Sequence, residues 1–359
     1  MLRLSKLVLL LLLVIISVPV HAQSSCGDLS TADCEILQTA QRATGNLPSA
    51  SFEATAEFAL GISFFPELIT VRVVSNGVYT RVPTITADIE EAYRPLFGLN
   101  ADMSIVIDAE ISEFVVPEDN TFTAALDLRY VDGVGYAELS KILPLIDPSL
   151  DADGWYSVDV ADYISRFMRD GIFPSDFLDT FATTYGVDSW ESFATEGSNR
   201  RLDDVQIGEQ SFAVFEASLY TRDYYDDNPD MYQNLIDAFE NLLHTQYGAF
   251  YTDDQLRNAA EFYADLTTNM QFSLTYWVSL DDGYIHDSQF DFIFIPDEDT
   301  PAQPDFDPLG IALLSTAELR FSLDFRYTQF ENIPLVSAPD DATPVRYEDL
   351  FGYGDSSPF

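Results

Sequence analysis

Apolar and polar residues alternate with a period of two over several long stretches of this chain. One stretch runs from Phe52 to Ile62, and another runs from Leu319 to Tyr327. Successive side chains of a β-strand point to opposite faces, so this period predicts strands with one apolar and one polar face. Many such strands predict a large antiparallel sheet whose apolar face must be covered.

Three pairs of β-rich runs are separated by Asn-Gly or Asp-Gly, a strong local signal for a β-hairpin. The expected hairpins pair Glu67–Ser75 with Val78–Val82, Phe122–Tyr130 with Val134–Leu139, and Phe272–Leu280 with Tyr284–Ile295. Further strands are expected at Ala101–Val116, Trp155–Tyr156 and Gln206–Tyr220. Tyr79, Tyr136 and Tyr284 lie one to three residues after the turn glycines, which indicates either a worn internal repeat or shared turn chemistry, since glycine supplies positive φ.

Helical patterns gather in the middle of the chain and near its N-terminus. Pro229–Tyr247 begins with proline at the first helical position and carries an apolar stripe at helical spacing, and Asp253–Thr268 carries a similar stripe. Short helices are expected over residues 162–195, and one more is expected over Ala32–Ala43. The order of strands and helices predicts an α+β fold with the helices on one face of an antiparallel sheet.

Residues 1–22 are typical of an export signal peptide. Arg3 and Lys6 precede an apolar run from Leu7 to Val18, and the sequence ending at Ala22 fits a cleavage site. The run is shorter than the ~20 residues that span a bilayer, although an uncleaved anchor is the alternative. We expect an extracytoplasmic protein (secreted, periplasmic or at the cell surface) with no transmembrane segment after cleavage.

Residues 23–50 are expected to form an N-terminal segment that contains a helix and a local disulfide. Cys26 and Cys34 are the two cysteines of the chain, and an oxidising compartment favours a bond between them. A lipid anchor at Cys26 is not expected, because Gln23 stands where a lipobox carries an aliphatic residue.

The chain is strongly acidic, with 60 acidic and 17 basic residues and a net charge of −43 at pH 7. This charge repels nucleic acid and anionic membrane surfaces, so neither is expected as a partner. It fits either solubility in a salty setting or attraction of cationic peptides, and the sequence identifies no partner protein.

Catalytic signatures do not occur in the sequence: there is no His-Glu-x-x-His, Gly-x-Ser-x-Gly or Gly-rich phosphate loop. Downstream of the leader there are two histidines, His244 and His286, and a catalytic triad would need one of them. We therefore expect no enzyme and no cofactor; the alternative is an unmarked hydrolase that depends on one of these histidines. The acidic clusters at Asp147–Gly154 and Asp223–Asp230 fit either solvated loops or calcium sites.

Three stretches resemble the bacterial lipoprotein-carrier and lipid-binding group typified by LolA and LppX/LprG. They are Gly154–Asp159, Trp277–Ile285, and Leu319–Phe330 together with Ile333–Pro334 and Ala338–Pro339. The resemblance implies a large curved antiparallel half-barrel, with helices packed on its concave face and a hydrophobic cavity between. The pattern along the chain, with no linker rich in Gly, Ser or Pro, predicts a single domain over 51–332, with helical segments at 162–195 and 229–268, followed by an extended C-terminal tail over 333–359. Three features of this sequence are not typical of the group: the defective lipobox, the acidic composition and the helical segment at 162–195.

These observations predict an exported, non-enzymatic binding or carrier protein for a lipid or other hydrophobic molecule. The two long helices are expected to act as a lid over its cavity. The residues expected to line this cavity are Tyr232, Leu235, Phe239, Phe290, Phe292, Phe294, Phe321 and Phe325. The alternative is an extracytoplasmic interaction or sensor domain with a filled core and no ligand.

Overall fold

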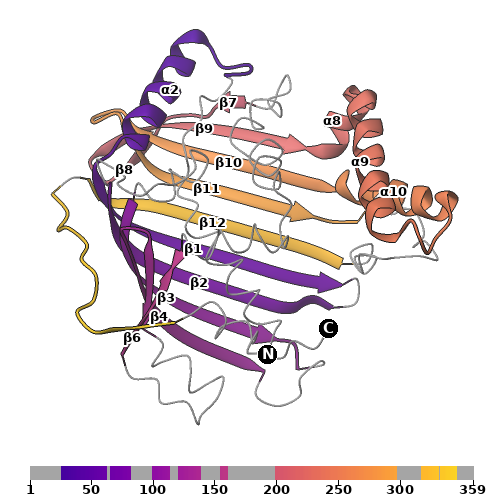
Figure 1. The fold of residues 1–359 in the computed structure, drawn as a ribbon. Helices are drawn as coiled ribbons and strands as arrows, with labels where there is room; N and C mark the ends of the chain where they lie inside the picture. Colours follow the sequence, from indigo (N-terminus) through magenta and orange to yellow (C-terminus); the bar gives the residue numbers. More distant parts are fainter. Residues whose placement is uncertain are drawn as a thin grey trace.

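The computed structural model describes residues 26–62, 65–81, 99–113, 120–138, 154–160, 199–296, 317–330 and 332–345. Its main feature is one open, curved sheet of 13 strands, with helices near both ends of the strands (Figure 1). The large antiparallel sheet and the α+β class expected from the sequence are confirmed. The leader expected at 1–22 and the helical segment expected at 162–195 lie outside the described residues.

The strands and helices alternate along the chain in blocks. The strands are β1 (Ser49–Ile62), β2 (Phe65–Arg81), β3 (Leu99–Ile111), β4 (Thr121–Val131), β5 (Val134–Glu138), β6 (Trp155–Asp159), β7 (Asn199–Arg201), β8 (Val205–Ile207), β9 (Gln210–Tyr220), β10 (Met270–Ser279), β11 (Ile285–Phe294), β12 (Ala317–Phe330) and β13 (Ala342–Pro344). The described helices are α2 (Thr31–Gly45), α8 (Thr221–Asp227), α9 (Pro229–Tyr247) and α10 (Asp253–Thr267).

The sheet is continuous from β13 to β7, in the order β13-β6-β5-β4-β3-β2-β1-β12-β11-β10-β9-β7, with β8 also pairing with β9. The long central strands β1 and β12 come from opposite halves of the sequence and pair antiparallel over their whole lengths. The short strand β13, within the expected C-terminal tail, pairs parallel with β6.

The register gives the sheet one apolar face and one polar face. Directly paired residues lie on the same face, so Phe52, Met103 and Phe321 belong to the apolar face, whereas Glu53 and Asp324 belong to the polar face. On β1, β3, β4, β9, β11 and β12, every Asp, Glu and Arg lies on the polar face. The alternation read from the sequence therefore becomes a complete separation of charge across these strands.

Two groups of helices cover opposite ends of the apolar face. Helices α9 and α10 pack on the ends of β10–β12, where Leu256 and Tyr263 form a core with Phe294. Helix α2 packs at the other end through Leu37 and Ala40. In Figure 1, α2 lies at the upper left of the sheet, and α8, α9 and α10 lie at its right. This arrangement confirms helices on the concave face and leaves the middle of that face between them.

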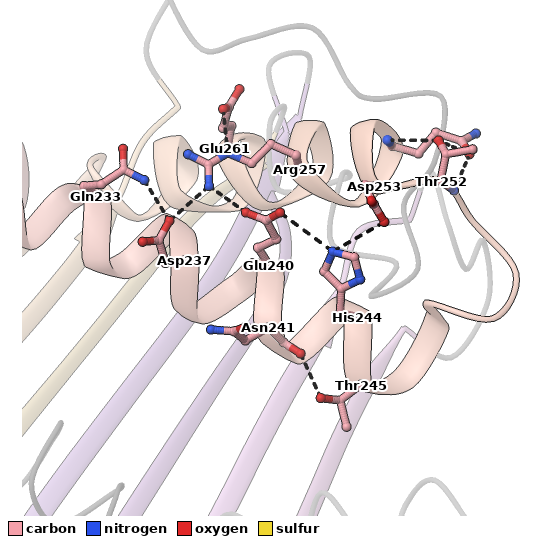
Figure 2. A network of polar contacts seen from close by, with 11 residues as sticks. Gln233, Asp237, Glu240, Asn241, His244, Thr245, Thr252, Asp253, Arg257 and Glu261 are labelled. Atoms are coloured by element: carbon pink, nitrogen blue, oxygen red, sulfur yellow. Dashed lines mark hydrogen bonds and ion pairs between the residues drawn. The ribbon is translucent and has the colours of Figure 1, made fainter.

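Ion pairs join α9 to α10, as Figure 2 shows. The Arg257 guanidinium lies 2.6 Å from Glu240 and 3.0 Å from Asp237, both on α9, and 3.0 Å from Glu261 on its own helix. Thr252 and Gln255 form a capping box at the start of α10. These contacts fix the two helices relative to each other along their exposed side, opposite the apolar stripe that contacts the sheet.

Helix α2 is fastened to the sheet by polar contacts as well as by packing. The expected disulfide between Cys26 and Cys34 is present, with 5.4 Å between their Cα atoms. The Asp33 carboxylate accepts a hydrogen bond from Arg201, and the Thr44 hydroxyl accepts one from the backbone N–H of Ile285. The N-terminal segment therefore closes the β9–β11 end of the apolar face.

The hairpin expected at Asn76-Gly77 is wrong, because β2 runs straight through both residues. Gly77 is extended there, and a Cβ built on it would meet the Asp102 carbonyl oxygen at 2.5 Å and the Phe52 ring at 3.0 Å. The glycine serves a close approach of neighbouring strands and not a turn. One of the three hairpins on which the possible internal repeat was based is therefore not formed.

The other two expected hairpins are confirmed. Asp132 and Gly133 both have positive φ between β4 and β5, and Gly283 has positive φ between β10 and β11. The single strand expected over Gln206–Tyr220 is instead a hairpin of β8 and β9, with Gly208 at positive φ in its turn. Helix α8 was not expected from the sequence, because its polar residues carry no apolar stripe.

Candidate functional site

The middle of the apolar face carries a row of aromatic side chains on adjacent strands. Phe272, Phe292, Phe321 and Phe58 are directly paired across β10, β11, β12 and β1, and we call these four residues the phenylalanine row. The Phe272 and Phe292 ring centroids are 5.1 Å apart. At about 4.8 Å per strand, the four residues span roughly 14 Å across the sheet.

The phenylalanine row is only partly covered. All four side chains are of intermediate exposure, as are Leu274, Phe290 and Leu323 in the next row towards α2. In contrast, Phe294 beneath α10 and Val278 beneath α2 are each 1% exposed. The helices therefore bury the two ends of this surface and leave an accessible apolar band between them, which is the usual character of a hydrophobic binding surface.

The predicted lining residues divide into two groups in the structure. Phe290, Phe292, Phe321 and Phe325 lie on the apolar face in or near the accessible band, whereas Phe294 is buried in the core beneath α10. Phe58 and Phe272 were not predicted, although both belong to alternating runs. The alternation of apolar and polar residues was present at both positions, but nothing in the sequence showed which strands pair.

The three predicted residues of α9 contact the helical core at one end of the sheet. The Tyr232 hydroxyl donates a hydrogen bond to Asp265 of α10, and the Phe239 ring meets the Tyr263 ring edge-on at 5.8 Å. Leu235 packs against the same core. The helices expected to form a lid thus border the accessible band at its β10–β12 end.

The polar face carries two shallow hollows. The larger, of about 790 Å³, crosses from β10 to β4 and is lined by residues such as Glu57, Arg72 and Asp291. The smaller, of about 480 Å³, lies towards β8 and includes Trp277 and Asp324. Partial burial raises the pKa of Asp324, and the nearby carboxylates of Asp291 and Glu57 raise it further.

We expect Asp324→Asn to raise the melting temperature at pH 7. The pKa of Asp324 in the folded chain is above its ordinary 3.8, so its ionised form is penalised by folding at neutral pH. The gain should shrink as the pH falls through the raised pKa, and it should vanish below 3.8. Thermal unfolding between pH 3 and 8 measures this; an equal gain at every pH would contradict it.

The described part of the chain holds no metal-binding cluster. None of its His, Cys, Asp and Glu residues form a group of three or more that could hold a metal ion. The Asp223–Asp230 cluster lies at the junction of α8 and α9, where Asp223 and Asp230 occupy first turns. His286 contacts Asp282 at 2.9 Å, and His244 lies 3.7 Å from Glu240.

Within the described helices, no segment is long and apolar enough to cross a membrane.

Comparisons with known proteins give structural likeness without sequence matches. No protein-family model matches the sequence, and no curated protein matches it. Among solved structures, LprF from Mycobacterium bovis aligns at 11% identity over 86% of this chain and 98% of LprF, with a TM-score of 0.33. The lipoprotein LppX from Mycobacterium tuberculosis aligns at 9% identity over 84% of this chain and 97% of LppX, with a TM-score of 0.28.

A third solved structure is one of lipid–protein interactions in lipovitellin. It aligns at 6% identity over 82% of this chain and 26% of lipovitellin, with a TM-score of 0.27. LprF and LppX are proteins of the kind that the sequence resemblance named. The fold of this chain is defined by its own strand order and register.

Proposed function

We propose that this protein is an exported, non-enzymatic binding or carrier protein for a lipid or another hydrophobic molecule. The observation that carries the proposal is the accessible band of the apolar face, which includes the phenylalanine row. The band is flanked by α2 at one end and by α9 and α10 at the other.

The energetics favour an apolar occupant for this band. Burying apolar surface contributes about 25 cal/mol per Å², and each buried methylene of an acyl chain contributes about 0.8 kcal/mol. On β1, β3, β4, β9, β11 and β12, Asp, Glu and Arg lie on the other face, so an acyl chain would meet none of their charged groups. A long hydrocarbon chain laid on this face would gain several kcal/mol.

Export is the second part of the proposal. The leader-like sequence at 1–22 and the Cys26–Cys34 disulfide both support an oxidising, extracytoplasmic compartment. In such a compartment, a carrier would shield the hydrocarbon part of a lipid from water during transfer between membranes.

Lipid uptake from vesicles tests the proposal. The mature chain, stripped of bound lipid by organic extraction and refolded, is incubated with neutral vesicles that contain fluorescent diacylglycerol in molar excess over the protein, then separated by gel filtration. We expect the label to co-elute with the protein at close to one molecule per chain. If the label stays with the vesicles while the protein is folded, the proposal fails and the filled-core interaction domain is the better account.

A further inference from the structure

The apolar face changes character along its strands. At the α9–α10 end, Met270, Phe294 and Leu319 present no hydroxyl group. A second row lies four residues from the phenylalanine row along β10, β11 and β12, in the direction of α2. It consists of the paired residues Tyr276, Ser288 and Phe325. At about 3.3 Å per residue, this second row lies roughly 13 Å from the phenylalanine row. Hydrogen-bonding groups therefore gather on the α2 side of the accessible band.

Two of these hydroxyl-bearing residues lie beside the accessible band, and the Tyr276 ring also packs against the core beneath α2. Tyr276 and Ser288 are both of intermediate exposure, and within the described part of the chain neither side chain makes a hydrogen bond. Burial raises the pKa of Tyr276 to about 12, so its hydroxyl stays protonated and can donate. By contrast, the hydroxyls of Tyr79 and Tyr327, deeper towards α2, bond to each other.

A hydroxyl in an apolar setting without a partner costs about 1–3 kcal/mol, so a ligand oxygen placed there would be favoured. A charged group would not be favoured, because a charge needs a partner of opposite sign to be buried. Arg81, on β2 near α2, is not such a partner, because its guanidinium already donates hydrogen bonds to the backbone carbonyls of Gly45 and Leu47.

Resting on the lipid-binding function proposed above, we propose that the bound molecule is amphipathic and lies in one direction along the strands. Its hydrocarbon chains cover the phenylalanine row near α9 and α10. Its uncharged hydrogen-bonding group, such as an ester, amide or hydroxyl, lies beside Tyr276 and Ser288 on the α2 side.

Two tryptophan reporters test the direction. Phe321→Trp places an indole in the phenylalanine row, and Phe325→Trp places one four residues closer to α2 on the same strand and face. Each variant is titrated with diacylglycerol brominated either near the ester or near the methyl end of its chains. The three native tryptophans, Trp155, Trp190 and Trp277, are common to both variants and give the same background.

We expect the methyl-end bromine to quench the tryptophan of Phe321→Trp more strongly, and the ester-proximal bromine to quench that of Phe325→Trp more strongly. The same order of quenching in both variants would overturn the orientation while leaving lipid binding intact. Absence of quenching in both variants would overturn the lipid-binding function as well.

Removing the hydroxyls tests the polar end separately. The double variant Tyr276→Phe with Ser288→Ala should bind diacylglycerol about five- to tenfold more weakly, the scale of one or two lost hydrogen bonds. Thr275→Val, which removes a hydroxyl from the polar face of the same strand, is the matched control and should bind as the wild type does. Equal affinities in all three proteins would overturn the role of Tyr276 and Ser288.

Discussion

Phe272→Asp is expected to lower lipid retention at least tenfold while the protein still folds. Phe272 stands at the end of the phenylalanine row, and its ring lies 5.1 Å from that of Phe292. An ionised carboxylate at this position would have to be desolvated by any hydrocarbon chain that covers the row, at a cost of several kcal/mol. Retention is measured as lipid bound per chain after gel filtration, and folding is measured by circular dichroism.

Two companion variants separate this effect from a general loss of structure. Gln271→Asp adds the same charge one residue earlier, but Gln271 is exposed on the polar face opposite Tyr220 and Ile293, so retention should be unchanged. Phe272→Leu keeps an apolar side chain and should retain most of the lipid. Equal retention by Phe272→Asp and Gln271→Asp, with both folded, would contradict binding on the apolar face.

Gly77→Ala is expected to lower the free energy of unfolding by about 2–3 kcal/mol, the usual scale for overpacking in a core. The added Cβ would meet the backbone oxygen of Asp102 at 2.5 Å and the Met103 side chain at 2.9 Å. A side chain can move, but the carbonyl belongs to the β2–β3 pairing and cannot move without breaking it. The melting temperature should fall by roughly 5 °C or more.

Gly135→Ala provides the matched comparison for Gly77→Ala. Gly135 is also a strand glycine, and its added Cβ would lie 3.3 Å from a Val160 methyl group and 3.9 Å from the nearest backbone oxygen. We expect a change within about 1 kcal/mol, because a methyl group can shift by a few tenths of an ångström. Thermal unfolding of both variants measures the two losses of stability. Equal losses would contradict the claim that the close approach of neighbouring strands requires glycine at position 77.

Local signals in the sequence were sufficient for several elements. Helix α9 begins and ends at the residues expected, because Pro229 fits the first helical turn and the apolar stripe continues to Tyr247. The turns at Gly133 and Gly283 were predictable because Asp-Gly pairs supply the positive φ that tight hairpins need. The alternation also predicted which residues share a face within each strand.

Long-range pairing decided what these signals could not. The Asn76-Gly77 sequence is a strong turn signal on its own, yet β2 continues through it because β1 and β3 bond to it on both sides. The phenylalanine row depends on Phe58 and Phe321 being directly paired, although they lie in opposite halves of the chain. No pattern within one strand fixes that register, so the row emerges only when the sheet is assembled.

Native mass spectrometry of the mature chain, exported from a bacterial host and purified without detergent, tests the central claim most directly. We expect a protein peak with an added mass that disappears on organic extraction and that is identified as lipid. The same measurement on Phe272→Asp should give the bare chain. A wild-type chain that carries no added mass and takes up none from added diacylglycerol would contradict the account.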